Sequence, residues 1–222
     1  MNNDAFEWSQ VWDAMPTMLD GLVIALQATV IGYVIALVLG LVFALLRRSD
    51  SRWVSMPVGF FVEFIRSTPL LVQLFFFFYV LPLIGISVSP LATGAFALGL
   101  HYATYTSEVY RSGIDGVPQG QWEAARALNL SRRRTWSAVI LPQAVPRVVP
   151  ALGNYVIAMF KDTPQLLAIT VVEMLGAAVA IGSETFRYSE PVAAAGLVYL
   201  VVALVMAWLA RIVERRFGQV RV

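Results

Sequence analysis

Long apolar runs constrain the fold of this chain more than any other feature of its sequence. Four of them are clear, at residues 22–46, 57–83, 90–110 and 192–212. Each supplies the roughly 20 residues that a helix needs to cross a hydrocarbon core about 30 Å thick. Only 14% of the residues are charged, whereas about a quarter are charged in a soluble domain. The sequence therefore predicts an all-α integral membrane protein.

Residues 145–181 are harder to assign, because Pro146, Pro150, Lys161, Asp162 and Pro164 interrupt the apolar sequence. One crossing or two would fit this region. The arginines decide between these alternatives, because basic flanks lie on the cytoplasmic side of a membrane. One cluster is at residues 132–134 and another follows the last run, at residues 211–221, so an even number of crossings separates them.

One crossing at about residues 145–161, together with the last run, satisfies this condition. Residues 166–181 then form a short helix near the outer surface or a re-entrant segment. The prediction is five transmembrane helices, with residues 1–18 external and residues 217–222 a cytoplasmic tail. The arginines at positions 47, 48 and 52 also fall on the cytoplasmic side, which is an independent check.

Composition also excludes several functional classes. The chain has no cysteine, which excludes disulfides and thiolate metal sites, and a single histidine is a poor basis for a metal centre. Its sole lysine, Lys161, follows Phe160, so the chain lacks the Gly-Lys-Ser/Thr of a phosphate-binding P-loop. The pI near 9.1 comes from arginines beside apolar runs, which favours lipid contact over nucleic-acid binding. Residues 1–20 lack the basic region of a cleavable signal peptide, and we expect them to remain on the mature protein.

A polar and basic stretch at residues 115–142 separates the third run from the following apolar sequence. Pro118 and Gln119 can start a helix, and an apolar stripe at helical spacing follows, formed by Trp122, Ala125 and Leu128. Ser131 is a candidate N-cap for a second helix that ends at Pro142. One interpretation is an amphipathic helix at the lipid headgroups, with residues 132–134 attracted to anionic lipid.

The other interpretation comes from a resemblance. Glu123-Ala124-Ala125, then Asn129, then Val139-Ile140-Leu141-Pro142 resemble the EAA loop of ABC importer permeases, which binds a groove on the ATPase subunit. The family usually has Gly where this chain has Asn129, and Asn is the non-glycine residue that most readily adopts φ > 0. The resemblance implies a coupling loop at about residues 113–143. Its implied contact residues are Gln121, Glu123, Ala124, Ala125, Arg126, Asn129 and Leu130.

Further motifs resemble the permeases for polar amino acids. They are Val62-Glu63-Phe64-Ile65-Arg66-Ser67-Thr68-Pro69-Leu70-Leu71-Val72-Gln73, Tyr105-Thr106-Ser107-Glu108-Val109-Tyr110-Arg111, Leu141-Pro142-Gln143-Ala144, Lys161-Asp162-Thr163 and Glu184-Thr185-Phe186-Arg187. Pro164 departs from the small polar residue that the family usually has there. Residues 182–188 resemble the members that transport ectoine and hydroxyectoine.

This resemblance implies the type I ABC importer permease fold, with the transmembrane domain at residues 19–216, in a bacterial inner membrane. The implied partners are a second permease subunit, identical or homologous, an external solute-binding protein, and a cytoplasmic ABC ATPase dimer that uses ATP and Mg. The chain itself is expected to bind no cofactor or metal and to catalyse no reaction. The runner-up is a secondary transporter or channel subunit without an ATPase, which would need an inverted repeat or a proton relay, and no repeat is seen.

Polar residues inside the apolar runs are the candidates for a solute pathway. They are Thr68, Gln73, Tyr102, Tyr105, Asn154, Lys161 and Asp162. An alternative for the adjacent Lys161 and Asp162 is that they hold an interrupted helix against its neighbours. The pairs Glu63/Arg66 and Glu108/Arg111 are three residues apart on a helix, and structural ion pairs are the better interpretation of both.

Overall fold

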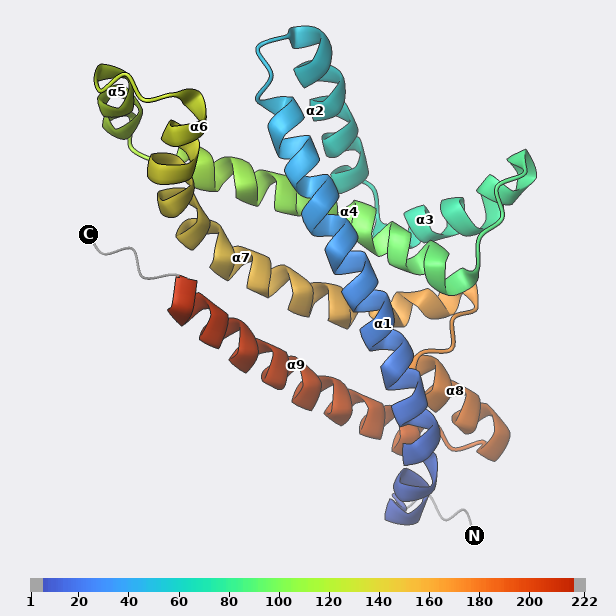
Figure 1. The fold of residues 1–222 in the computed structure, drawn as a ribbon. Coiled ribbons are helices and arrows are strands. Elements are labelled where there is room, and N and C mark those ends of the chain that lie inside the picture. The colour runs from blue at the N-terminus through green and yellow to red at the C-terminus, as the bar shows by residue number, and fades with distance from the viewer. Residues whose placement is uncertain (1–5, 218–222) are drawn as a thin grey trace. The chain divides into compact units, whose positions relative to one another are not determined.

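The computed structural model describes residues 6–217, and these residues form helices joined by short connections (Figure 1). The first five and last five residues, which include part of the predicted external segment and most of the predicted tail, lie outside the described residues. The chain divides into two compact units built from interleaved segments. The first unit contains residues up to Val34, Thr68–Gly99 and Ala158–Val205, and the second contains Ile35–Ser67, Leu100–Ile157 and the residues from Met206.

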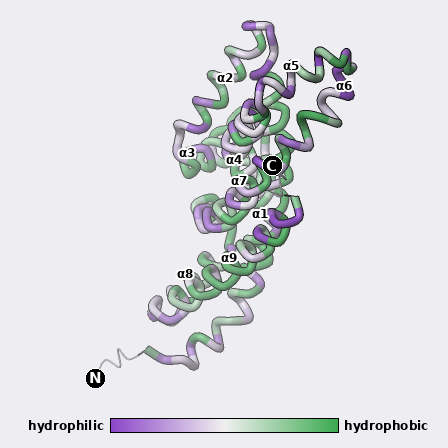
Figure 2. The backbone as a smooth tube through the Cα atoms, turned by 90° about the vertical axis from the view of Figure 1, so that its left-hand side faces the viewer, coloured by the Kyte–Doolittle hydropathy of each residue, from purple (hydrophilic) through white to green (hydrophobic). Residues whose placement is uncertain are grey.

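Among the described residues, α1 (Trp8–Arg47) and α9 (Ser189–Phe217) are each long and apolar enough to cross a membrane, and Figure 2 shows the hydrophobic residues along them. The prediction started the first span at Leu22 and placed residues 1–18 outside it, but the helix already begins at Trp8. The reason is packing within the first unit. Val11, Ala14 and Met18 are buried in a core cluster with Met174 and Ala194, so this segment gains apolar contacts by being helical.

The second apolar run is not one straight helix. Helix α2 (Arg52–Ser67) ends just before Thr68–Pro69, and α3 (Leu70–Phe75) follows with a π turn (Phe76–Val80) and a 3-10 turn (Leu81–Ile84). Pro69 has no N–H to donate and disfavours the helical conformation of Thr68. The Gln73 amide then donates to the carbonyl of Thr68 at 3.1 Å and to its hydroxyl at 2.8 Å.

The third run lies within α4 (Pro90–Asp115), whose polar side chains are satisfied by backbone carbonyls. Thr104 donates to the carbonyl of His101 at 2.6 Å, and Thr106 donates to the carbonyl of Ala36 in α1 at 2.8 Å. Because of its polar residues, α4 is not among the described helices that are apolar enough to count as a span. By length and hydropathy, two described helices qualify, or up to four if each bent pair is one span, so the number five stays a prediction.

The fourth predicted span is continuous despite its prolines. Helix α6 (Arg132–Arg134) runs through a π turn (Thr135–Ile140) into α7 (Leu141–Asp162), which contains Pro146 and Pro150. The prediction that a coupling helix ends at Pro142 is therefore wrong. In the π turn the Leu141 N–H donates to the Trp136 carbonyl, five residues earlier, instead of to the carbonyl four residues earlier. The helical hydrogen-bond pattern has therefore already changed just before Pro142, which has no N–H to donate, and the helix continues through it.

Residues 163–185 form a 3-10 helix (Thr163–Ile169) and then α8 (Met174–Thr185), which is capped by a buried carboxylate. Fully buried Glu173 accepts a hydrogen bond from the Gly176 N–H at 2.9 Å and another from the Tyr199 hydroxyl. The Thr163 hydroxyl lies 3.2 Å from that of Tyr199. These bonds join α8, α9 and the 3-10 helix within the first unit.

The first unit also contains a cluster of ion pairs around Arg187, near the beginning of α1. Arg187 donates to Glu7 at 2.7 Å and also pairs with Glu190 at the start of α9. The hydrogen bond with Glu190 raises the pKa of Arg187, so the guanidinium remains charged. The cluster therefore ties the residue before α1 to the first turn of α9.

Candidate coupling loop and polar network

The predicted coupling loop contains the short helix α5 (Gln119–Ala127), which ends as its sequence suggests. Asn129 has a positive φ of 50°, as expected for a residue in the position of the family's Gly. The Leu130 N–H donates to the Ala125 carbonyl at 3.0 Å and the Asn129 N–H to the Arg126 carbonyl at 2.9 Å. This pair of bonds is a Schellman-type helix end, and it fixes the direction in which the chain leaves α5.

The inner face of α5 rests on a small apolar core in the second unit. This core is formed by Ile114, Val117, Ile140 and Ala144, with Trp122, Trp136 and Val139 packed against it. The rings of Trp122 and Trp136 are 5.4 Å apart and nearly perpendicular, a favourable edge-to-face contact. Ala125 is 2% exposed. The loop is therefore held against the end of α4 and the beginning of α7.

The predicted apolar stripe is only partly correct. Leu128 is 73% exposed, although Trp122 and Ala125 face inward. The reason is that α5 ends at Ala127, and Leu128 is its C-cap with a non-helical ψ of 6°. Helical spacing therefore does not apply to Leu128.

The outer face of α5 holds most of the predicted contact residues. Gln121, Glu123, Ala124, Arg126 and Asn129 are exposed, whereas Ala125 is buried and Leu130 is half-buried. The Glu123 carboxylate accepts from the Gln119 amide at 3.0 Å and still faces solvent. This surface offers a carboxylate beside a small side chain, so a partner can approach its backbone closely.

The segment after α5 has the predicted cap. The Ser131 hydroxyl accepts from the Arg134 N–H at 3.4 Å. Gln143 on α7 donates to the Val139 carbonyl at 2.8 Å and to the Gln121 side chain at 3.3 Å. The exposed face of α5 is thus also linked to α7 by a hydrogen bond.

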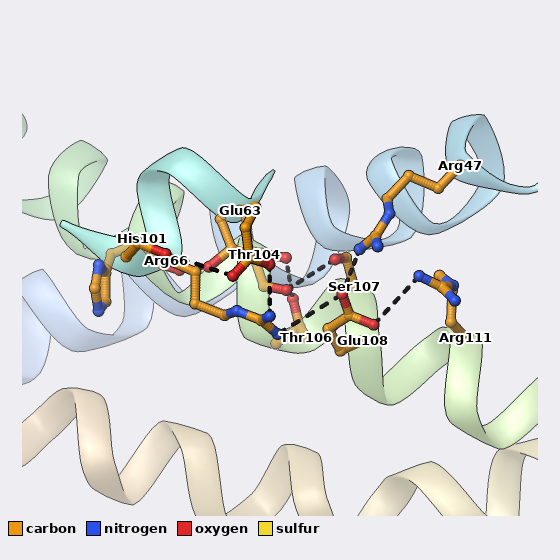
Figure 3. Close-up of polar contacts among 11 residues, drawn as sticks. Arg47, Glu63, Arg66, His101, Thr104, Thr106, Ser107, Glu108 and Arg111 are labelled. Carbon is orange, nitrogen blue, oxygen red and sulfur yellow. Dashed lines mark hydrogen bonds and ion pairs between the residues drawn. The ribbon is translucent and has the colours of Figure 1, made fainter. Parts of the chain in front are cut away.

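A polar network lies in the second unit where α1, α2 and α4 meet (Figure 3). Glu108 on α4 pairs with Arg47 at the end of α1 and with Arg111 at 3.4 Å. Arg66 on α2 is 3.7 Å from Glu108 and 2.6 Å from Glu63. The two predicted i,i+3 pairs are confirmed, but the contacts between helices were missed, because nothing local marks partners 61 residues apart.

A second missed contact ties the same helix ends together. Arg48, next to Arg47, pairs with Asp115, the last residue of α4. Asp115 lies four positions before Gln119, the first residue of α5. The end of α1 is therefore fixed to the end of α4 immediately before the coupling loop begins.

The candidate pathway residues of the second unit gather in part. Tyr102 and Tyr105 pack with Tyr155 of α7, with ring centroids 6.0 and 5.7 Å from the Tyr155 ring. The ring centroid of His101 lies 5.3 Å from that of Tyr105, so the histidine packs within this aromatic group. Tyr155 was missed, since one tyrosine in an apolar run carries no distinctive signal. Asn154 is exposed on α7.

The remaining candidates belong to the first unit. Thr68 and Gln73 are hydrogen-bonded to one another, as described above. Lys161 is exposed, whereas Asp162 is half-buried, as expected for adjacent residues that point in different directions. In the part of the chain that the structure describes, no group of His, Asp and Glu side chains could hold a metal ion.

Comparisons with known proteins agree with this architecture. Residues 36–219 match the family described as the inner membrane component of binding-protein-dependent transport systems. A probable amino-acid ABC transporter permease of Sinorhizobium fredii, y4tG, is 52% identical over 200 residues, which are 90% of this chain and 87% of that protein. The arginine transport system permease ArtQ of Bacillus subtilis is 33% identical, over 95% of this chain and 96% of ArtQ.

The solved structures include an amino acid ABC transporter described as being with histidines. One of its chains has a TM-score of 0.90 with this protein at 32% identity, over 96% of this chain and 99% of that chain. The resemblance to ABC importer permeases that the motifs carried is therefore confirmed. The chain belongs to the family of inner-membrane components of binding-protein-dependent transport systems.

Proposed function

We propose that this chain is the permease subunit of an ATP-driven importer for a polar amino acid or a related zwitterion. The coupling loop binds a cytoplasmic ABC ATPase dimer, which consumes ATP and Mg. The pathway lies between two permease subunits, identical or homologous, and an external solute-binding protein delivers the solute. The observation that carries this proposal is the coupling loop, whose inner face is packed on its own chain while Glu123 and Ala124 face outward.

The packing of α5 explains how ATP-driven closure would reach the membrane. Interiors packed like the cluster around Trp122 and Trp136 transmit displacement instead of absorbing it. A movement of α5 therefore moves the end of α4 and the beginning of α7. Such coupling requires two states of the permease that differ in affinity for the closed ATPases.

The solute class is supported by the names of similar proteins and by the chemistry of the candidate residues. Relatives that match almost the whole chain are named for amino acids or for arginine. The aromatic faces of Tyr102 and Tyr105 can attract a cationic group, and Lys161 can meet a carboxylate. Ectoine is one candidate zwitterion, supported by residues 182–188. A structural role for Lys161 and Asp162 is the alternative for those two residues.

The experiment that tests the function is uptake into vesicles. The permease is reconstituted with its ATPase, and the binding protein is added outside with radiolabelled arginine, glutamine or ectoine in turn. We expect uptake of one of these solutes that requires both ATP and the binding protein. Uptake driven by an ion gradient without ATP would contradict the proposal and favour a secondary transporter.

The arginine distribution also predicts orientation. With five spans, a reporter fused to the C-terminus is cytoplasmic, and one inserted at residues 85–89, an exposed segment after the left-handed Gly85, is external. Alkaline phosphatase and green fluorescent protein fusions at both sites give opposite signals if this is correct. An externally active C-terminal fusion would show that residues 166–181 form a sixth crossing.

A further inference from the structure

Arg66 is the side chain in the polar network with acceptors on two different helices. Its guanidinium is 2.6 Å from Glu63 on α2 and 3.7 Å from Glu108 on α4 (Figure 3). At 2.6 Å, Arg66 and Glu63 form a hydrogen bond. At 3.7 Å, Arg66 and Glu108 form an ion pair, but they are too far apart for a hydrogen bond. Arg66 is therefore bonded to its own helix while it stands close to a second carboxylate.

Three guanidinium groups, those of Arg47, Arg66 and Arg111, lie within ion-pair distance of the single carboxylate of Glu108. Arg47 pairs with the same oxygen of Glu108 that Arg66 approaches, and Arg111 is 3.4 Å from the other oxygen. The side chains of Arg66, Glu63 and Glu108 are 34%, 58% and 31% exposed, so water partly screens each pair. Neither the contact of Arg66 with Glu63 nor its contact with Glu108 is then strong enough to exclude the other. A movement of the guanidinium by about 1 Å towards Glu108 would bring it within hydrogen-bond distance of that carboxylate instead of Glu63.

The positions of these residues connect that exchange to the coupling loop. Glu108 lies on α4, whose end at Asp115 is fixed to α1 by Arg48 and leads directly into α5. On the other side, Arg66 is the penultimate residue of α2, just before the break at Thr68–Pro69. A shift of α4 relative to α2 changes the distance between the Glu108 carboxylate and the Arg66 guanidinium. The backbone spacing of Glu63 and Arg66 stays fixed because both lie on α2, so Glu63 remains within reach of Arg66 in either state.

We propose that Arg66 is a positioning residue whose guanidinium exchanges between Glu63 and Glu108 as the permease changes state, so that the end of α2 is tied to α4 in one state and released in the other. This inference rests on the proposed function, because it assigns a role in the ATP-driven transition. This role differs from that of a purely structural ion pair, because Glu108 stabilises the state in which α2 is tied to α4, whereas Glu63 stabilises the released state.

The test removes each acceptor separately. Glu63→Gln should favour the tied state and Glu108→Gln the released state, so the two variants should change basal ATP hydrolysis by the assembled transporter in opposite directions, each by about fivefold. Glu214→Gln, which removes a half-buried carboxylate of α9, is the matched control and should have little effect. Changes in the same direction, or no change in either variant, would overturn the proposal.

A distance measurement tests the movement directly. The chain has no native cysteine, so spin labels can be placed at exposed positions by Phe64→Cys on α2 and Ser112→Cys on α4. Without nucleotide, Glu63→Gln should enrich the shorter distance and Glu108→Gln the longer one. Identical distance populations in both variants would overturn the proposal.

Uptake by the unlabelled transporter, measured beside these distances, separates this inference from the proposed function. If the unlabelled chain showed no ATP-dependent uptake, the importer assignment would fail. The nucleotide-free distances would still decide the role of Arg66.

Discussion

Glu123→Lys should abolish both solute uptake and the stimulation of ATP hydrolysis, while the permease still inserts and folds. Glu123 is exposed on the outer face of α5, and its hydrogen-bond partner Gln119 lies on the same helix, so its replacement leaves the apolar core beneath α5 intact. Losing one partner of a charged contact that an interface buries costs roughly 2 to 5 kcal/mol, which is enough to dissociate a modest interface. Uptake, ATP hydrolysis and co-purification of the ATPase measure the result.

The matched control is Asp50→Lys, which reverses an exposed carboxylate in the connection between α1 and α2. It should leave uptake and ATPase binding close to those of the parent chain. Normal uptake by Glu123→Lys would remove the main support for the coupling loop.

Substitutions of the two neighbouring alanines should distinguish a residue that contacts the ATPase from one that stabilises the fold of the permease. Ala124 is exposed, so Ala124→Trp should block ATPase binding without a change in the melting temperature of the isolated permease. Ala125 is buried, so Ala125→Trp should lower that temperature as well, because overpacking costs about 1 to 3 kcal/mol.

Gly40→Val should prevent assembly of a folded permease. Gly40 of α1 packs directly on α4, where an added Cβ would lie 2.9 Å from the Ala103 carbonyl and closer still to the Thr106 hydroxyl. Thr106 is fully buried and donates to Ala36, so it cannot turn away without losing that bond. Overpacking at such a helix contact should cost about 3 kcal/mol or more, measured as loss of the monodisperse peak in detergent.

Gly59→Val on α2 is the control, because the nearest atom to its added Cβ is Arg47 Nε at 3.8 Å. Its yield should match the parent chain. The milder variant Gly40→Ala should be partly rescued by Thr106→Ala, which removes the closest clashing atom. Equal yields of Gly40→Val and Gly59→Val would show that α1 and α4 do not pack through this glycine.

Local chemistry made much of this protein predictable from its sequence. The apolar runs indicated membrane helices because only helices and closed barrels satisfy the backbone in lipid. The cap at Ser131, the left-handed turn at Asn129 and the pairs Glu63/Arg66 and Glu108/Arg111 were also predictable. Each depends on residues at most a few positions apart, where helix geometry alone sets the distance.

Other features depended on which helices meet. Helix α1 starts at Trp8 because Val11 and Met18 pack against residues about 160 positions later, and Trp122 faces inward because residues from α4 and α7 form the apolar core that it contacts. The pairing of Glu108 with Arg47, and the contact of Tyr155 with Tyr102, also join distant segments. The sequence by itself therefore determined the helical membrane class and the local turns and caps. Only the tertiary structure decided which faces are covered and which charges meet, because these depend on packing between segments that no local pattern specifies.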